Sequence, residues 1–275
     1  AVSFYEQRLW FGGTKKYPQR IWGSELGVYD SFDFSGATST RAIDIEIGSS
    51  DTIDRILWLA AQKKLIIGTE GSEWTLSANS ALEGLTASSI RLSRESGYGS
   101  GGFRPELIGN QVVFTGRMGK SLRAFSYSLD SDSYMANNLA MLNLDLIKSG
   151  ISHFAYQQEP SSIIWVLTKS NRLLSCTYYP SENVVAWSQH NTIGRWGSLT
   201  VIPKVDERDE LWLSCYRSVK ESSGKIVNRQ YIERMIGINS ELGGVECSWY
   251  VDCGGAYAYE DVAIFSITTS HFINE

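Results

Sequence analysis

The amino-acid sequence predicts an all-β protein, specifically a β-propeller of five or six four-stranded antiparallel blades. Aromatic residues make up 12% of the 275 residues, and 25 glycines lie mostly between short apolar runs. This composition is typical of strands separated by tight turns. A strand–turn–strand pattern also recurs about every fifty residues, close to the length of one propeller blade. Finally, one of these copies can be divided into four consecutive strands.

The repeat is defined by one apolar position in each copy. We call these positions anchors, and they are Leu9, Leu65, Val112, Ile164 and Leu211. Successive anchors are 56, 47, 52 and 47 residues apart. Propeller blades take roughly 40–50 residues. We therefore predict a propeller domain over residues 1–240, with room for one incomplete or irregular blade. Residues 241–275 are expected to supply the last strands or the start of a following domain that is cut off.

The fourth copy is the clearest. Its strands are predicted at 151–158, 162–169, 172–179 and 183–190, joined by "EPS", "SN" and "PSE". Connections this short make neighbouring strands antiparallel. The second strand, "SIIWVLTK", is largely apolar on both faces, as expected for a sheet packed between two others.

Two other segments receive structural predictions. In "RLWFGGTKKYPQRIWGS", which opens at Arg8, we predict a hairpin with a projecting loop over 12–19. In the stretch 137–150, Leu139, Leu142 and Leu146 have helical spacing, which predicts a short helix between two blades.

Motifs that suggest chemistry are better explained as turns. "GYGSGG" (97–102) matches G-x-G-x-x-G, but Pro105 and a strand pattern follow where a dinucleotide site needs a helix, so a flexible loop is predicted. "DSDSY" (130–134) lacks the later ligands of an EF-type calcium loop, and "DERDE" (206–210) fits a hairpin tip in water. We predict no cofactor, metal or catalytic residue.

Charge and cysteine usage exclude further classes. The net charge of −5 argues against nucleic-acid binding as the main role, since that affinity is mostly electrostatic. There is no apolar run long enough to cross a membrane and no signal-peptide pattern. Cys176 and Cys215 are predicted as buried free thiols, whereas Cys247 and Cys253 could pair or bind metal. The three histidines lie outside metal-binding motifs and are expected to be ordinary strand or loop residues: His153, His190 and His271.

The nine tryptophans divide into two groups. Those in strand-like runs are core candidates: Trp10, Trp58, Trp165 and Trp212. Those nearer turns are mainly expected to pack over blade edges, and are also candidates for lining a sugar-binding groove: Trp22, Trp74, Trp187, Trp196 and Trp249. The alternative glycan contacts are Trp22, Trp74, Glu70 and Glu73.

Several segments resemble, in order, those of tailed-phage and prophage structural proteins. They are "FYEQRLWFGGTKKYPQRIWGSELGVYDSFDF", "AIDIEIGSSDTIDRILWLAAQKKLIIGTEGSEW", "ESGYGSGGFRPELIGNQVVFTGRMGKSLRAFSYSLDSDSY", "ISHFAYQQEPSSIIWVL" and "RQYIERM". The likeness runs from about Phe4 to Met235, and the family is that of the tail nozzle (tail tubular protein B) of short-tailed phages. The closing "VDCGGAYAYEDVAIFSITTSHFINE" resembles the start of that family's next segment, cut off here.

The resemblance implies a non-enzymatic structural role. In that family a propeller-like domain decorates a ring, generally of six subunits, beneath the portal and adaptor, through which the genome leaves. It implies a protein made in the bacterial cytoplasm and located in the virion tail. Expected partners are further copies of the chain, the tail adaptor, fibres or the tail tip, without sequence-specific nucleic acid or membrane.

Polar insertions between strands are the candidate partner-contact loops, at 15–19, 95–104 and 220–225. Their candidate residues are Lys15, Lys16, Tyr17, Gln19, Tyr98, Phe103, Arg104, Lys220 and Lys225. Two alternatives stay open at this point: a carbohydrate-binding propeller or depolymerase remnant, and a hydrolase with an unrecognised site.

Overall fold

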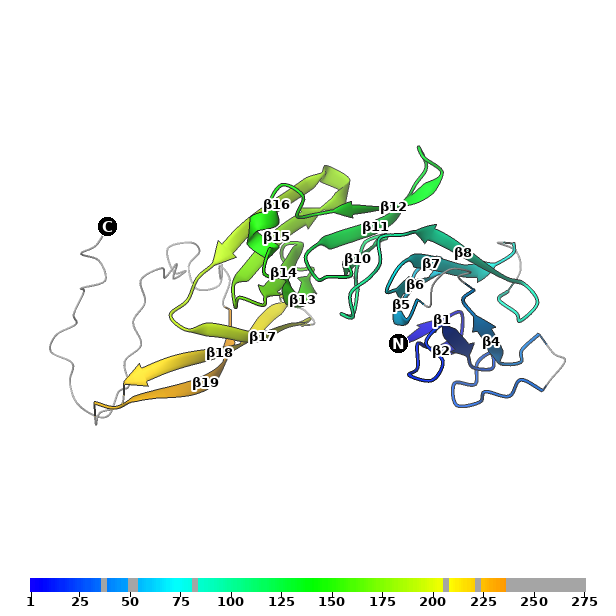
Figure 1. Ribbon diagram of the computed structural model, residues 1–275, viewed down its shortest axis with the longest axis horizontal. Helices are drawn as coiled ribbons and strands as arrows, with labels where there is room; N and C mark the ends of the chain where they lie inside the picture. The colour runs from blue at the N-terminus through cyan, green and yellow to red at the C-terminus, as the bar shows by residue number, and fades with distance from the viewer. Residues whose placement is uncertain (36–38, 49–53, 81–83, 205–207, 221–223, 236–275) are drawn as a thin grey trace. The chain divides into compact units, whose positions relative to one another are not determined.

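The computed structural model confirms the all-β class. It describes residues 1–35, 39–48, 54–80, 84–204, 208–220 and 224–235. These residues form nineteen strands in five antiparallel sheets, with one short α-helix and one 3-10 turn (Figure 1). The chain divides into two compact units, residues 1–151 and 152–275, where the sequence predicted one domain over 1–240. The predicted boundary at 240 and the segment 241–275 lie outside the described residues.

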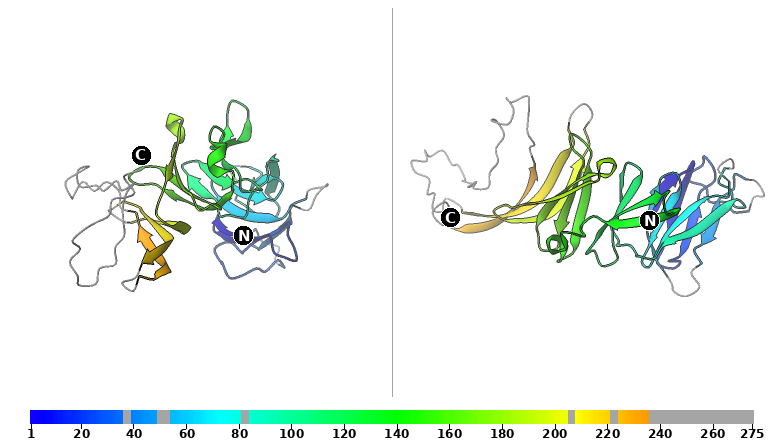
Figure 2. Two further views of the ribbon diagram at one scale, coloured as in Figure 1. Left: turned by 60° about the vertical axis from the view of Figure 1, so that its left-hand side comes forward. Right: turned by 90° about the horizontal axis from the view of Figure 1, so that it is seen from above.

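Unit 1 holds three four-stranded meanders, each with its strands side by side in chain order (Figures 1 and 2). The first consists of β1 (Val2–Tyr5), β2 (Arg8–Gly12), β3 (Arg20–Gly23) and β4 (Ile43–Glu46). The second consists of β5 (Ile56–Ala61), β6 (Leu65–Thr69), β7 (Glu73–Ala78) and β8 (Ile90–Ser96). The third consists of β9 (Glu106–Ile108), β10 (Gln111–Thr115), β11 (Leu122–Ser128) and β12 (Ser133–Asn138), followed by α1 (Leu144–Ile147).

Unit 2 holds two sheets, and its first strand begins at the last residue of unit 1. The first sheet of unit 2 consists of β13 (Ile151–Gln157), β14 (Ile163–Thr168), β15 (Leu173–Tyr179) and β16 (Val184–His190), with a 3-10 turn (Pro180–Glu182) between the last two. The other sheet has three strands among the described residues: β17 (Arg195–Ile202), β18 (Glu210–Lys220) and β19 (Ile226–Arg234).

The predicted repeat is confirmed strand by strand. All five anchor positions lie in the second strand of their sheets, namely β2, β6, β10, β14 and β18. The four strands predicted over 151–190 agree with β13 to β16 to within one residue at each end. The predicted opening hairpin is also present, because β2 pairs antiparallel with β3. The recurring sequence pattern therefore marks one meander per copy.

Strand β6, in the middle of the sheet β5–β8, is buried on both faces. Along β6, Leu65 and Ile67 belong to a cluster shared with the first sheet, whereas Ile66 between them belongs to a cluster shared with the third sheet. Strand side chains alternate between faces, so an unbroken apolar run serves both clusters. Each buried aliphatic side chain contributes roughly 1.5–3 kcal/mol to the hydrophobic driving force.

Unit 2 has a cluster of its own. Trp165 and Leu167 of β14 pack with Trp196 of β17 and with Leu211 and Leu213 of β18. The predicted buried free thiols are confirmed, because Cys176 and Cys215 are both buried and unpaired. Cys247 and Cys253 lie outside the described residues, as do Trp249 and His271.

A buried arginine joins the first two sheets of unit 1. The Arg8 guanidinium donates to the carbonyl oxygens of Ser24 (2.6 Å) and Arg41 (2.8 Å), and more distantly to those of Ser39, Thr40 and Leu85. Burial lowers the pKa of Arg8, yet an arginine stays charged in proteins. One side chain thereby fixes the connection between β3 and β4 against the one between β7 and β8.

Three sequence predictions need correction. The helix predicted within 137–150 covers only Leu144–Ile147, because β12 continues to Asn138 and Leu142 is exposed. Glu210 of "DERDE" is buried at the start of β18, where Lys204, Arg234 and the Trp212 indole bind it. Trp196 is a core residue rather than a turn residue, whereas Trp212 is only partly buried.

Gly68 of β6 supplies a test of the packing between sheets. A Cβ atom at this position would lie 2.0 Å from Cε2 of the buried Trp58 ring. We expect Gly68→Ala to lower the free energy of unfolding by about 1–3 kcal/mol, because the indole has to move within a filled core. Urea unfolding followed by tryptophan fluorescence measures the change.

Gly48→Ala is the matched control. A Cβ atom there has no neighbour within 4 Å, so its effect should stay within about 0.5 kcal/mol. Equal unfolding midpoints for the two variants would show that Trp58 does not fill the space beside Gly68.

Candidate functional site

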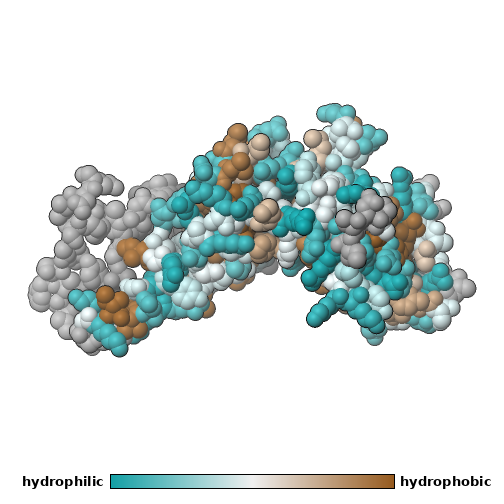
Figure 3. Space-filling view, in the orientation of Figure 1, coloured by the Kyte–Doolittle hydropathy of each residue, from teal (hydrophilic) through white to brown (hydrophobic). Residues whose placement is uncertain are grey.

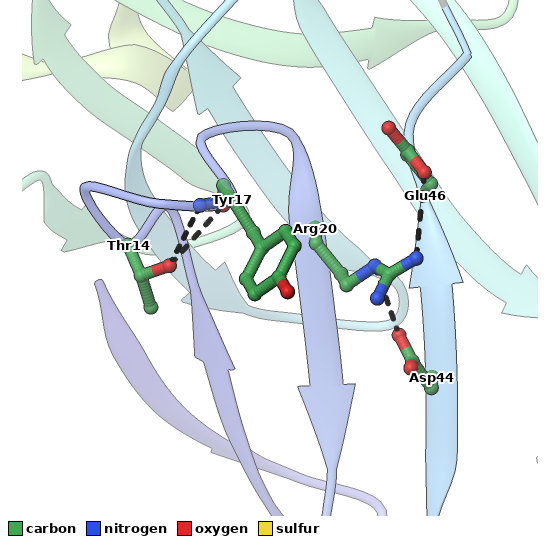
Figure 4. Close-up of polar contacts among 5 residues, drawn as sticks. All are labelled: Thr14, Tyr17, Arg20, Asp44 and Glu46. Atoms are coloured by element: carbon green, nitrogen blue, oxygen red, sulfur yellow. Dashed lines mark hydrogen bonds and ion pairs between the residues drawn. The ribbon is translucent and has the colours of Figure 1, made fainter.

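A group of polar and aromatic side chains lies on the exposed face of β3 and β4, next to the β2–β3 loop (Figure 4). We call it the Tyr17 cluster, and it consists of Lys16, Tyr17, Arg20, Trp22, Asp44 and Glu46, of which Figure 4 draws Tyr17, Arg20, Asp44 and Glu46. The strand register pairs Arg20 with Glu46 and Trp22 with Asp44. Directly opposed residues of antiparallel strands share one face, so these four side chains are neighbours.

Arg20 is the centre of the Tyr17 cluster. Its Nε lies 3.5 Å from Asp44 Oδ1 and its Nη2 lies 3.6 Å from Glu46 Oε2. Its guanidinium carbon also lies 5.0 Å from the centroid of the Tyr17 ring. Ion pairs this exposed contribute at most about 1 kcal/mol each. These ion pairs hold Arg20 between Asp44 and Glu46 at the surface and add little to the stability of the fold.

The loop holds Tyr17 in place while leaving it accessible. The Tyr17 backbone N–H donates to Thr14 Oγ1 (3.1 Å), and the Tyr17 ring packs edge-on against Trp22 with 6.1 Å between centroids. Lys16 Nζ lies 5.2 Å from the same ring, whose residue is 42% exposed. The loop therefore presents an aromatic ring with two cations close to it.

A second group of polar residues is buried where β6 turns into β7. Glu73 is fully buried and accepts hydrogen bonds from Ser96 Oγ and from Ser100 Oγ (3.0 Å). Ser72 Oγ donates to Asp54 Oδ2 (3.1 Å) and accepts from Trp74 Nε1 (2.8 Å). The expectation that Trp74 and Glu73 are exposed glycan contacts is wrong, because both face the packed interior of unit 1.

The glycine-rich loop that follows β8 closes over this group. Gly99 has φ +74°, and a Cβ atom there would lie 2.3 Å from the backbone oxygen of Glu70. This approach brings Ser100 to Glu73, while Tyr98 lies under the Arg123 guanidinium at 4.0 Å. The predicted loop is present, with β9 after it, but it is fixed by these contacts rather than flexible.

The structure brings only some of the predicted contact residues together. Lys15, Lys16 and Tyr17 share one exposed loop, with Gln19 partly buried beside them. Tyr98, Phe103 and Arg104 follow β8, and of these Phe103 is partly buried. Lys220 and Lys225 are exposed at the far end of the β18–β19 hairpin, and Glu70 is exposed near Tyr98. Within unit 1, the predicted residues thus lie on two loops, β2–β3 and the one after β8.

Sequence reasoning missed Arg20, Asp44 and Glu46. The signal was present, because "AIDIEI" alternates apolar and acidic residues and so predicts a strand with one charged face. The partner strand of that segment was not assigned, and cross-strand neighbours follow only from the pairing. Arg8 was also missed, since a charged residue at the start of a strand is usually exposed.

Among the residues described, no group of three His, Cys, Asp or Glu side chains is arranged to hold a metal ion. His190 is a structural residue of β16, because its Nε2 lies 2.9 Å from Ser175 Oγ and its ring packs against Trp165. No helix in the described part of the chain is long and apolar enough to cross a membrane.

Burial raises the pKa of Glu73, opposed by hydrogen bonds from Ser96, Ser100 and the Tyr98 backbone and by the charge of Arg123. Between the ordinary glutamate pKa and the raised pKa of the folded state, Glu73 therefore keeps its proton in the folded protein and has lost it in the unfolded chain. Stability that depends on this proton is complete below the ordinary glutamate pKa and declines as pH rises through the folded pKa. The decline is at most about 1.4 kcal/mol per pH unit.

We predict that Glu73→Gln removes this decline, because glutamine does not ionise. The unfolding free energy of the wild type minus that of the variant should fall as pH rises above the ordinary glutamate pKa. Urea titrations over a pH series measure it, with Glu70→Gln, at an exposed neighbouring position, as the control. A difference that stays constant or grows with pH would mean that the hydrogen-bond donors, not burial, determine the ionisation of Glu73.

Comparison with known proteins finds no family model and no curated protein sequence that matches this chain.

Proposed function

We propose that the chain is a non-enzymatic structural module of a bacteriophage tail that contributes to tail assembly and to the genome-ejection channel. The observation that carries the proposal is the regular succession of meanders, with an anchor in the second strand of each sheet. The order of segments resembling the tail-nozzle family, from about Phe4 to Met235, supports it further. The buried polar groups support a scaffold role as well, since Arg8 and Glu73 both link connections between strands.

We further propose that the five sheets are blades of a propeller-like domain of five or six blades. Within each unit, successive sheets share an apolar cluster, as adjacent blades do. The sheet β17–β19 is the incomplete blade of this proposal, with three strands among the described residues. Such sheets are stiff and project their loops outward, which suits contacts with neighbouring subunits, fibres or an adaptor.

The charge of the chain is compatible with this role. A net charge of −5 gives a surface that binds phosphates weakly, which is useful in a particle through which DNA passes. In this proposal the chain is made in the bacterial cytoplasm, forms part of a ring of about six copies and ends in the virion.

The proposal predicts that the chain is a stoichiometric part of purified phage particles. Quantitative mass spectrometry of gradient-purified virions should find its peptides in several copies per particle. An antibody raised against residues 1–235 should label the tail in negative-stain micrographs, with an antibody to the major capsid protein as the control for position. Absence of the chain from intact, infectious particles would refute the proposal.

A second candidate function is carbohydrate binding, and one observation favours it. Tyr17 and Trp22 present aromatic surface beside Asp44 and Glu46, and aromatic rings with adjacent carboxylates suit sugar hydroxyl and C–H groups. Two of the four expected contacts, Trp74 and Glu73, are buried and do not support it. Lys16 and Arg20 also lie close to the Tyr17 ring and leave less of it for a sugar.

A glycan screen distinguishes the two candidates. If the Tyr17 cluster binds carbohydrate, a surface glycan should bind with a millimolar or tighter dissociation constant, and Trp22→Ala should weaken binding at least tenfold. Tyr98→Ala, at an exposed tyrosine outside the Tyr17 cluster, should leave it unchanged. If Trp22→Ala leaves glycan binding unchanged, the Tyr17 cluster is excluded as the carbohydrate-binding site.

A further inference from the structure

The loop that follows β8 and the turn between β10 and β11 lie side by side in unit 1. The Arg117 backbone N–H donates to the carbonyl oxygen of Gly99 (3.1 Å), and Ser100 forms an isolated β-bridge with Gly116. The exposed side chains of the loop and of the turn therefore belong to one surface. Together with two arginines that reach it, they make up what we call the basic surface: Arg94, Tyr98, Arg117, Met118, Lys120 and Arg123.

Arg123 and Tyr98 form the centre of the basic surface. The Arg123 guanidinium carbon lies 4.0 Å from the centroid of the Tyr98 ring, and Arg123 Nη1 donates to the carbonyl oxygen of Ala136 (2.8 Å). The attraction between a guanidinium and a ring face holds the two groups together. Tyr98 is nevertheless 54% exposed. The loop therefore presents an aromatic ring that is positioned by the fold and accessible to a partner.

Three further cations of the basic surface are available to a partner. Arg94, Arg117 and Lys120 are exposed, and none of them forms an ion pair with any residue that the structure describes. Arg94 reaches the loop, because its Nη2 would lie 3.5 Å from a Cβ atom added at Gly97. The charges of these three side chains can therefore pair with a ligand without breaking a contact of the fold.

The acids near the basic surface leave its exposed charge positive. Residues 94–123 contain five basic side chains and two acids, for a formal charge of +3. One of these acids, Glu95, accepts a hydrogen bond from Thr75 Oγ1 (2.5 Å). Glu73 is fully buried beneath the loop, and Glu70 is an exposed acid whose backbone oxygen adjoins the loop. The exposed cations therefore outnumber the exposed acids here.

The residue types of the basic surface favour a protein partner. Arginine, tyrosine and methionine are enriched at protein–protein interfaces, and tyrosine and arginine are frequent hot-spot residues. Met118 is 74% exposed, and its flexible side chain can adapt to apolar groups. The side of the third sheet that faces the viewer in Figure 3 is mainly hydrophilic, in teal and white. We therefore expect charged contacts to predominate, with a few apolar ones beside them.

A long polyanion such as DNA fits the chain less well. The rest of the chain carries a formal charge of −8, the difference between −5 for the whole chain and +3 for residues 94–123. Affinity for a duplex depends on many phosphate contacts, whereas this surface offers few cations. A short acidic segment of a protein needs only these local cations.

We propose that the basic surface binds an acidic segment of a partner protein. Carboxylates of the segment would pair with Arg94, Arg117 and Lys120, and each forked guanidinium can bind a carboxylate through two hydrogen bonds. An aromatic or aliphatic side chain of the segment would pack on Tyr98 and Met118. This inference goes beyond the proposed tail function, because it identifies the chemistry of a partner from the surface alone.

The size of the basic surface sets the expected strength. A contact made by one loop and one turn lies below about 1,200 Å² of total buried area, in the range of weak associations. We therefore expect a dissociation constant in the micromolar range. Because opposite charges carry much of the contact, added salt should weaken it.

The test is the binding of a labelled acidic peptide to the whole chain. Fluorescence anisotropy of a fluorescein-labelled peptide of repeating Glu-Glu-Phe should give a micromolar dissociation constant at low salt, and binding should weaken as salt is added. Arg117→Glu/Lys120→Glu should weaken binding at least tenfold. Lys169→Glu/Arg172→Glu makes the same change of charge at the same spacing in the exposed β14–β15 turn, and it should leave binding unchanged.

A second peptide tests the contact with the ring. Replacing phenylalanine by alanine in the peptide should weaken its binding to the wild-type chain. Tyr98→Ala should weaken binding of the peptide with phenylalanine several-fold and should have little effect on the peptide with alanine, because the ring then has no partner. If both peptides lose affinity equally, the proposed contact with the ring is wrong. Circular dichroism and urea unfolding of each variant check that the sheets are intact.

Three results would overturn the inference. One is no binding of the acidic peptide at low salt with up to millimolar protein. Another is binding that the two charge-reversal variants weaken equally, because any cation of the chain would then serve. The third is tighter binding of a single-stranded oligothymidylate of the same charge, lost in Arg117→Glu/Lys120→Glu, which would assign the surface to nucleic acid. A chain found in the tails of purified virions would support the tail function in all three cases, so the two failures are distinguishable.

Discussion

The structure depends on a constraint imposed by stacking one sheet on another. A sheet between two others has no face in water, so every residue of its central strands must be apolar, small or internally hydrogen-bonded. Strand β6 meets this requirement with Leu65, Ile66 and Ile67 buried in succession and with Gly68 leaving space for Trp58. Polar groups are thereby displaced to the strand ends, where the connections run. The apolar sheet faces therefore provide stability, and the polar contacts of the buried interior are made at the connections between strands.

Buried polar residues act at those connections. Arg8 donates to carbonyl oxygens from two separate strand connections of unit 1, and Glu73 accepts from the loop that follows β8. Loss of either side chain would leave buried groups without partners, which costs about 1–3 kcal/mol for each neutral group and more for charged ones. Burial of Glu73 beneath this loop raises the pKa of its carboxyl group, and the hydrogen bonds that fix the loop oppose the shift.

The sequence predicted the repeat more successfully than the candidate site, for a physical reason. Strand spacing and apolar runs are local properties, and all five anchors fall in equivalent strands. Burial of a polar residue depends on what packs over it. Glu73 and Trp74 were alternative glycan contacts, yet the distant loop at Gly99 lies close to Glu70 and Glu73 is buried. The Tyr17 cluster depends likewise on the pairing of β3 with β4, which spacing alone does not specify.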